Sequence, residues 1–343
     1  MVRRSGKFCG STWLIAGGGW LALALLAISV RASGDDAKPV LLQLQWRPQA
    51  QFAGYIVAKE KGFFAEEGAP NVELRWYREG DPPMKLVADG KVDFCTGWLS
   101  QAIKLRAEGV KIVNVGQIMQ ESTLMLVAWR RLGIVKPQDM TGRNVGLWGA
   151  DFDVPALALF KKFGVHPNIV PQSYSITPFL RRAVHVASAM YYNEYHKLME
   201  AGVQAEEIQT FFYPDYGLNF PEDGLYCTDA TRLGRAKVCS AVVSASIKGW
   251  AYAAKNEVET LDLVMEYCKG AQLATNRNHQ RWMLRTVLSS IQHRVGPDPA
   301  RWGALLKEDY ENVAKALCDL RFIRVSPPFD DLYKPAFGAR GTP

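Results

Sequence analysis

The chain has 343 residues, of which 48% are hydrophobic and 22% are charged. This is the composition of a globular protein large enough to form two lobes, and it excludes a disordered or repetitive chain. The formal net charge is +7. Four of the positive charges lie in residues 1–32, which contain no acidic residue, so +3 remains for the rest of the chain. That small excess does not favour a partner made of nucleic acid.

Residues 1–32 have the layout of a secretory signal peptide. Arg3, Arg4 and Lys7 form a basic start, an apolar stretch follows up to Val30, and small residues precede a cleavage site near Ala32. The apolar stretch also approaches the length of a membrane-spanning helix. An uncleaved membrane anchor is therefore the alternative to a cleaved signal peptide.

The next segment predicts a strand, an aromatic turn and a helix. Residues 40–46 have the composition of a buried strand, which Pro48 ends. Apolar residues then recur at helical spacing, and Gly62 stands where a left-handed residue would close the helix. Ligands of open α/β sheets bind outside the carboxyl ends of the strands. We therefore expect the side chains at this turn to face a ligand, namely Trp46, Gln49, Phe52 and Tyr55.

Further strands and helices alternate along the chain, which predicts an α/β fold with mostly parallel sheets. Strands are expected over residues 71–76, 92–95, 111–118 and 124–129, and then over residues 144–148, 169–174, 184–190 and 208–212. Residues 231–343 are predicted to be largely helical. The pattern restarts after residue 124 and returns near residue 225. We therefore predict one lobe from residues 38–124 and 226–343, and a second from residues 125–225, with two hinge crossings between them.

Five cysteines follow the predicted signal peptide, and they form no CxxC pair or zinc-finger spacing. An oxidising compartment permits disulfides. Cys227 and Cys239 are the pair closest in sequence and the predicted disulfide. The sequence leaves the connectivity open, because at least one of the five must stay free.

Aromatic and polar residues follow several of the predicted strands. Trp46, Trp98 and Trp148 each stand between a short apolar strand and a helix, where they could offer a flat face to an aromatic ligand, or simply pack in the core. The polar candidates for hydrogen bonds to a heterocycle are Asp151, Asn193, Glu194, Asp215, Tyr216 and Glu222. Asn193 and Asp215 could instead cap helices or turns.

An anionic ligand and enzyme chemistry are the alternatives to this reading. Arg47 and a helix that begins near Gly97 could receive a sulfonate or phosphate. The five histidines show no spacing typical of a metal site, and the nucleophile and phosphate-binding motifs GxSxG, GxxxxGKS/T and GxGxxG are absent. We therefore predict no catalytic residue, no cofactor and no metal site.

Several separated motifs resemble one known family. They are QWxxQxQFAGYxxAxEKGFFxxEG at residues 45–68, GKVDF at 90–94, VGLWGADF at 145–152, MYYNEY at 190–195 and EDGLY at 222–226. This family comprises the periplasmic substrate-binding proteins of ABC importers for thiamine-pyrimidine precursors, taurine and alkanesulfonates, with the related eukaryotic thiamine-pyrimidine synthases. The resemblance covers roughly residues 40–230 and implies a two-lobed periplasmic binding protein fold.

The resemblance also implies a function. The NEY and EDGLY elements look like the pyrimidine-precursor branch, so the expected protein is the periplasmic solute-binding component of an ABC importer that delivers a hydroxymethylpyrimidine-type ligand to a permease. The synthases hold pyridoxal phosphate on a lysine and use a histidine four residues later. The matching positions here are Gly97 and Gln101, and only Cys227 remains of the synthases' cysteine-rich run. Transport is therefore favoured over synthesis, and a sulfonate-binding protein and a membrane-anchored sensor are further alternatives.

Overall fold

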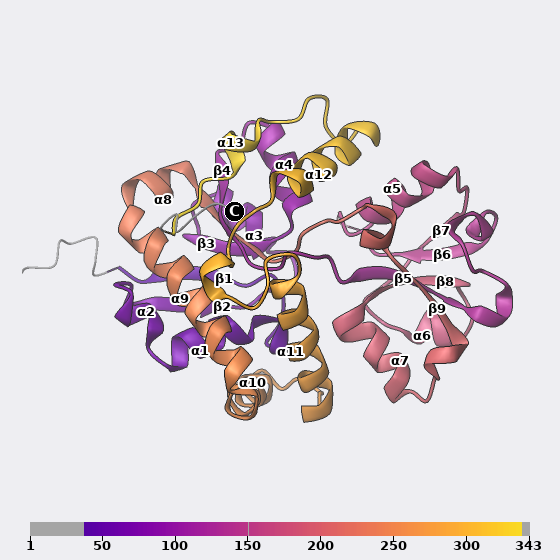
Figure 1. Ribbon diagram of the computed structural model, residues 1–343, viewed down its shortest axis with the longest axis horizontal. Coiled ribbons are helices and arrows are strands. Elements are labelled where there is room, and N and C mark those ends of the chain that lie inside the picture. The colour runs from indigo at the N-terminus through magenta and orange to yellow at the C-terminus, as the bar shows by residue number, and fades with distance from the viewer. Residues whose placement is uncertain (1–37, 150, 338–343) are drawn as a thin grey trace, which may run out of the picture. The chain divides into compact units, whose positions relative to one another are not determined.

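The computed structural model describes residues 38–149 and 151–337. The predicted signal peptide lies outside these ranges. Within the described residues, no helix combines the length and the apolar character needed to cross a membrane. Residues 39–343 form one compact unit, which contains two five-stranded sheets (Figure 1).

The first sheet has the strand order β2-β1-β3-β10-β4. Its strands are β1 Val40–Gln43, β2 Val72–Arg75, β3 Phe94–Gly97, β4 Ile112–Gln117 and β10 Gly224–Thr228. The second sheet has the order β7-β6-β8-β5-β9. Its strands are β5 Leu124–Trp129, β6 Asn144–Leu147, β7 Asn168–Pro171, β8 Val186–Met190 and β9 Ile208–Phe212.

Both sheets are mixed, so the prediction of mostly parallel sheets is wrong in part. β1 runs parallel to β2 and β3, and β6 runs parallel to β7 and β8. β10 and β5 run antiparallel to both of their neighbours. These are the strands by which the chain enters the second sheet and returns to the first. Each of them arrives from the other sheet, so its direction is not set by a crossover helix between parallel strands of one sheet.

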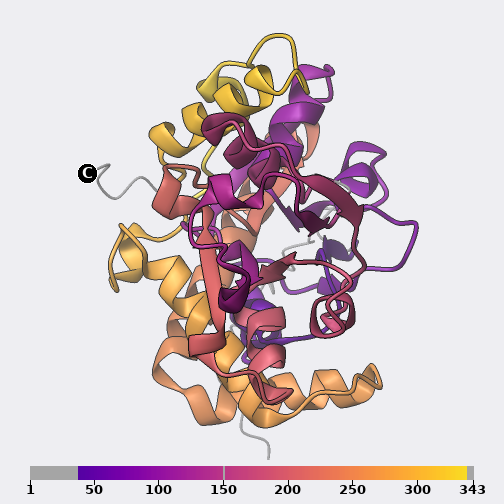
Figure 2. The ribbon, with the colours of Figure 1, turned by 90° about the vertical axis from the view of Figure 1, so that its right-hand side faces the viewer.

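Helices cover both sheets. Between the early strands lie α1 Ala53–Glu60, α2 Phe63–Glu66, α3 Pro83–Ala88 and α4 Leu99–Ala107, and beside the second sheet lie α5 Val154–Phe163, α6 Thr177–Leu180 and α7 His196–Glu200. The C-terminal part contains α8 Asp229–Gly234, α9 Ala236–Lys255, α10 Glu257–Gly270, α11 Arg277–Gln292, α12 Lys307–Asp319 and α13 Phe329–Leu332. Gly62 has a φ of 73° between α1 and α2, as its place in the sequence predicted. Figure 2 shows the C-terminal helices from a second direction.

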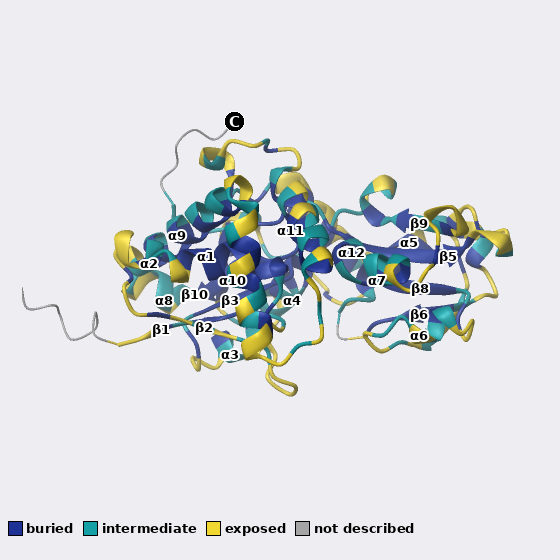
Figure 3. Cartoon of the chain, turned by 90° about the horizontal axis from the view of Figure 1, so that it is seen from below, coloured by how far each residue is buried: buried dark blue, intermediate teal, exposed yellow. Residues whose placement is uncertain are grey.

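The strands differ in how far they are buried. β5 and β8, in the middle of the second sheet, are buried along their whole length (Figure 3), and so is β4, although it lies at the edge of the first sheet. The edge strand β7 is mostly exposed. The edge position also explains why β7 tolerates Pro171, since proline lacks the N–H that a central strand would use. The amphipathic helices α1 and α9 pack closely against each other.

The predicted disulfide between Cys227 and Cys239 is wrong, because all five described cysteines are free. Both residues are buried, on β10 and α9, and the interaction between their thiols raises the pKa of Cys227. The Cys239 thiol donates a hydrogen bond to the Thr231 carbonyl at 3.7 Å instead of forming a bond to sulfur. Short sequence separation therefore predicted the proximity of the two residues but not the covalent link.

Candidate functional site

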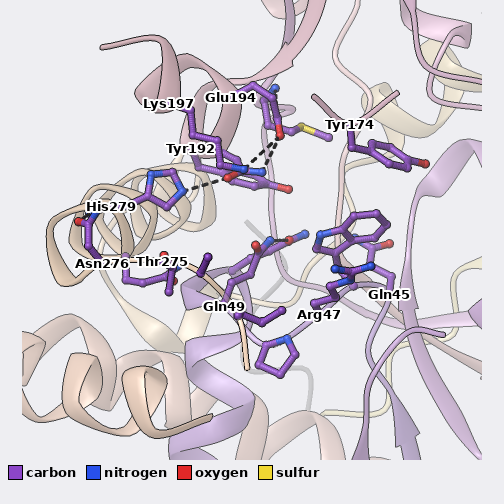
Figure 4. A pocket seen from close by; sticks show the side chains of 18 of the residues that line it. Gln45, Arg47, Gln49, Tyr174, Tyr192, Glu194, Lys197, Thr275, Asn276 and His279 are labelled. Carbon is purple, nitrogen blue, oxygen red and sulfur yellow. Dashed lines mark hydrogen bonds and ion pairs between the residues drawn. The ribbon is translucent and has the colours of Figure 1, made fainter. Parts of the chain in front are cut away.

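A pocket of about 680 Å³ collects side chains from the ends of four strands. The turns after β1, β3, β6 and β8 reach it, together with residues 273–280 at the start of α11. Figure 4 shows Gln45, Arg47 and Gln49 facing Tyr192, Glu194 and Lys197 across this space. The four strands belong to the parallel parts of the two sheets, whose carboxyl ends are the usual ligand-binding edge. A pocket of this volume suits a small organic molecule.

One part of the wall is aromatic. The Trp46 ring is partly exposed, lies 5.2 Å from the Tyr77 ring in a stacked arrangement and meets the Tyr174 ring edge-on at 4.8 Å. The Trp148 indole N–H donates to the Ser173 carbonyl at 3.2 Å, which fixes the ring beside Tyr174. These rings present flat apolar surfaces to whatever enters the pocket.

Glutamine side chains form a second part of the wall, and buried Asp223 holds two of them. Gln45 and Gln51 both donate hydrogen bonds to the Asp223 carboxyl, the latter at 3.0 Å. Gln49 in turn donates to the Gln51 carbonyl oxygen at 2.6 Å. Burial, and then the neighbouring Glu222, raise the pKa of Asp223 well above its ordinary value. The amides are therefore oriented before any ligand arrives.

The turn after β8 is a π-helix, Tyr191–Tyr195, a rare element that is often found at functional sites. It points Tyr192, Asn193 and Glu194 into the pocket wall. The Glu194 carboxylate accepts from the Met190 backbone N–H at 3.1 Å and from the Asn193 amide at 2.6 Å. Burial raises the pKa of Glu194, although Lys197 at 4.0 Å opposes this effect.

The start of α11 closes the same wall. Asn276 caps the helix by accepting the His279 backbone N–H at 2.9 Å, and the Gln280 carbonyl oxygen accepts the Ala50 backbone N–H at 2.7 Å. His279 Nε2 lies 3.0 Å from Asn193 Oδ1 (Figure 4). Burial lowers the pKa of His279 to about 4, so its imidazole is neutral at neutral pH. This contact links α11 directly to the π-helical turn.

The structure brings six of the predicted site residues to this pocket: Trp46, Gln49, Trp98, Trp148, Asn193 and Glu194. It places the others elsewhere. Phe52 and Tyr55 are fully buried in the core. Asp151 forms an ion pair with Lys104. Asp215 lines a separate depression, and Tyr216 packs edge-on against Phe163.

Glu222 has a structural environment away from the pocket. Its fully buried carboxylate accepts from the Thr123 backbone N–H at 2.6 Å, from Ser122 Oγ at 2.8 Å and from the Leu124 backbone N–H at 3.2 Å. It thus joins the segment leading into β5 to the segment leading into β10. Burial raises the pKa of Glu222 to about 7 despite these hydrogen bonds.

Many of the residues that line the pocket were not predicted from the sequence. Arg47 lines the pocket and was expected only as a partner for an anionic ligand. The polar and aromatic lining residues that were not predicted are Gln45, Gln51, Phe152, Tyr174, Tyr192, Lys197, Glu200, Thr275, Asn276, His279 and Gln280. Some carried a local signal, since Tyr192 adjoins the predicted Asn193. Residues 275–280 carried none beyond a helix cap, because only the tertiary fold brings α11 to the π-helical turn.

The charged groups at the pocket are balanced. Arg47 and Lys197 supply positive charge, and Glu194 and Glu200 are the carboxyl groups. Amide oxygens and carboxylates accept hydrogen bonds, while amide N–H groups and the two cations donate them. Flat rings beside this mixed set of donors and acceptors suit a small heterocycle that carries amino and ring-nitrogen groups.

Comparisons with known proteins show which chains this one is similar to. The family model described as NMT1/THI5 like matches residues 49–260. The formylaminopyrimidine-binding protein of Halalkalibacterium halodurans is 24% identical and aligns with 82% of this chain and 86% of its own length. The riboflavin-binding protein RibY of Chloroflexus aurantiacus is also 24% identical, over 78% of each chain.

The fold has solved counterparts. The periplasmic aliphatic sulphonate binding protein SsuA from Escherichia coli superposes with a TM-score of 0.65 at 12% sequence identity, covering 89% of this chain and 96% of that one. The two sheets and their helices therefore form a two-lobed periplasmic binding protein fold, as the sequence predicted.

Proposed function

Because this chain belongs to the NMT1/THI5 like family, we propose that it is the solute-binding component of an ABC importer and binds a hydroxymethylpyrimidine-type thiamine precursor. It would work in the periplasm after removal of residues 1–32 and deliver its ligand to a membrane permease. Its two lobes are residues 38–124 with 226–343, and residues 125–225. Lobe closure removes water from the ligand, which strengthens every hydrogen bond in the pocket.

The observation that carries the proposal is the pairing of exposed aromatic surface with the Asn193–Glu194 pair in one pocket. A pyrimidine ring can stack against Trp46 or Tyr174, while its amino group donates to the Glu194 carboxylate. The relative from Halalkalibacterium halodurans is named for binding a formylaminopyrimidine, which has the same ring chemistry.

The charge balance speaks against a sulfonate. A sulfonate needs cationic or backbone N–H donors free of competing carboxylates. Here Lys197 lies 4.0 Å from Glu194, so the nearest ammonium group is already partly neutralised by that carboxylate. Arg47 is exposed at the opposite side of the pocket.

The residues do not fit the pyridoxal phosphate of the family's synthases. The position that would carry the imine-forming lysine is Gly97, and a Cβ atom there would lie 2.4 Å from the Met84 methyl group. A side chain at this position would therefore have to push the end of the Met84 side chain aside. We assign no synthase step to this chain.

A thermal-shift screen of the full mature protein tests the proposal. A ligand that binds only the folded state raises the melting temperature. We expect hydroxymethylpyrimidine and its formylamino analogue to raise it, and taurine and riboflavin to leave it unchanged. A shift by taurine or riboflavin alone would overturn the ligand assignment. An imine absorption band after incubation with pyridoxal phosphate would instead support the synthase alternative, and mass spectrometry of the mature N-terminus separates a cleaved protein from an anchored sensor.

Substitution of Trp46 locates the binding site. Trp46→Ala removes a stacking surface, and we expect the affinity for hydroxymethylpyrimidine to fall about tenfold, which corresponds to roughly 1.4 kcal/mol. Phe322→Ala is the matched control, because Phe322 is 38% exposed and lies outside the pocket. Equal affinities of wild type and Trp46→Ala, measured by calorimetry, would place the ligand elsewhere.

A further inference from the structure

Two histidines and a glutamate that are far apart in sequence meet at the edge of the pocket. His196 and Glu200 lie one turn apart on α7, and His279 lies on α11. The Nδ1 atoms of the two histidines are 2.9 Å apart. Glu200 Oε2 lies 3.8 Å from His196 Nδ1 and 3.6 Å from His279 Nδ1. Three potential metal ligands therefore converge on one point.

These separations match one face of a metal-coordination tetrahedron. Ligand atoms placed about 2.0–2.2 Å from a tetrahedral Zn²⁺ ion lie roughly 3.3–3.6 Å from one another. The three observed distances, 2.9, 3.6 and 3.8 Å, bracket this range. Small side-chain rotations are enough to bring all three atoms to bonding distance. Two imidazoles and one carboxylate are also the ligand set of many zinc sites that keep an open fourth position.

Hydrogen bonds from neighbouring residues orient two of the three ligands. The Asn193 amide N–H₂ donates to Glu194 Oε1 at 2.6 Å, so Asn193 Oδ1 faces His279 and accepts its Nε2–H at 3.0 Å. The Nδ1 lone pair of His279 therefore points toward His196, whose Nδ1–H donates to it at 2.9 Å, and a metal ion would take the place of that proton. The Asn276 amide donates to Glu200 Oε1 at 2.8 Å, which leaves Oε2 directed at the histidines.

The site is accessible to an ion. Glu200 is exposed and gives an ion a route from solvent. Lys197 follows His196 on α7, and Glu194, which lies 4.0 Å from its ammonium group, partly neutralises that charge.

From this geometry we propose that His196, Glu200 and His279 form a binding site for a divalent transition-metal ion of the Zn²⁺ class. Glu200 and His279 also line the pocket, whereas His196 lines the separate depression that contains Asp215, so the ion would lie at the edge of the pocket. A water molecule or a ring nitrogen of the solute would be the fourth ligand. Because α7 lies between β8 and β9 of the second sheet and α11 belongs to the C-terminal helices, the ion would link these two parts of the fold.

The sequence contained a partial signal for this site. His196 and Glu200 have the i, i+4 spacing that places two side chains on one helical face. The spacing is common on solvent-exposed helices and does not by itself indicate a metal site. His279 is 83 residues from His196, so only the fold reveals the third ligand.

Zinc titration of the full mature protein, freed of metal by dialysis against a chelator, tests the site. We expect one Zn²⁺ per chain by calorimetry and by elemental analysis after desalting, with at least tenfold weaker binding in His196→Ala and in Glu200→Gln. His166→Ala is the matched control, since His166 is exposed and outside the cluster, and it should bind zinc as the wild type does. Circular dichroism confirms that each variant is folded.

Cobalt provides a second measurement that does not depend on variants. Co²⁺ in the same site should give the visible absorption of a tetrahedral ion with nitrogen and oxygen ligands, and Zn²⁺ should remove it by displacement. The proposal is overturned if the wild type shows no saturable zinc binding. It is also overturned if His196→Ala and Glu200→Gln bind zinc as tightly as the wild type, or if His166→Ala loses binding equally. None of these results depends on whether the pocket binds a pyrimidine.

Discussion

At the scale of single residues, Glu194 is a buried carboxyl group that we propose contacts the ligand. Only 3% of its side chain is exposed, and its pKa is raised by burial. An amino group of a ligand would add a hydrogen bond to those that Met190 and Asn193 already donate to this carboxyl, and hydrogen bonds to charged groups contribute about 1.5–3 kcal/mol. The side chain thus has more to gain from a ligand than an exposed carboxylate would.

Glu194→Gln tests this role. The amide keeps the shape of the side chain but loses its charge, so we expect affinity for hydroxymethylpyrimidine to fall at least tenfold by calorimetry, with little change in melting temperature. Glu206→Gln is the matched control on the exposed surface. A Glu194→Gln variant with wild-type affinity would contradict the assignment.

Glu222 is a second single residue with an expected effect, in this case on how the stability of the protein depends on pH. Its pKa is about 7 in the folded protein, whereas a carboxyl in an unfolded chain has a pKa near 4.3. Between these values the folded state binds more protons than the unfolded state, so the free energy of unfolding decreases as pH rises. The expected loss for this one group is on the order of 3 kcal/mol between about pH 4 and pH 7.

Glu222→Gln should therefore make the dependence of stability on pH shallower over this window. The amide oxygen can still accept the bonds from Ser122, Thr123 and Leu124, so the variant is expected to fold. Urea denaturation at a series of pH values measures the slope, with Glu206→Gln as control. Identical slopes in wild type and Glu222→Gln would show that Glu222 is ionised across the window.

At the scale of elements, the helices α1 and α9 come into close contact at two glycines, Gly54 and Gly249. A Cβ atom at Gly249 would lie 2.0 Å from the Gly54 carbonyl oxygen, and one at Gly54 would lie 2.3 Å from the Trp250 ring. The backbone of one helix thus fills the space that a side chain on the other would need. The same contact supports the aromatic turn that precedes α1.

Gly249→Ala is accordingly expected to destabilise the protein by roughly 3 kcal/mol, because the added methyl group meets backbone and cannot be accommodated by a rotamer change. Gly270→Ala in α10 is the matched control. A Cβ atom there meets nothing within 4 Å, so alanine should be neutral or slightly stabilising. Chemical denaturation of both variants checks the difference. Equal stabilities would mean that the two helices separate easily.

The elements also show what the sequence could predict. Strand composition and helix spacing predicted β1, α1 and the turn with Trp46. The expectation that ligands bind at the carboxyl ends of strands also identified Trp98, Trp148 and Glu194, which line the pocket. Helical periodicity alone could not tell that Phe52 and Tyr55 face the core, because the first six residues of α1 are all buried and leave no distinct exposed face there. The contact of α11 with the π-helical turn depends on long-range packing, so Asn276 and His279 were not predicted.

At the scale of the whole molecule, the two hinge crossings meet at Glu222, whose carboxylate binds one crossing while its backbone belongs to the other. The pocket lies between the strand ends of the two sheets, and its polar groups are held by hydrogen bonds among themselves. A protein of this kind recognises a ligand by shape and hydrogen bonding and releases it by opening.

Calorimetric titration of the full mature protein with hydroxymethylpyrimidine is the most direct test of the proposal that the protein binds a pyrimidine precursor. We expect saturable binding of one hydroxymethylpyrimidine molecule per chain, with the negative heat-capacity change that burial of apolar surface produces. An absence of binding heat for any pyrimidine, together with saturable binding of an alkanesulfonate that Trp46→Ala abolishes, would contradict it.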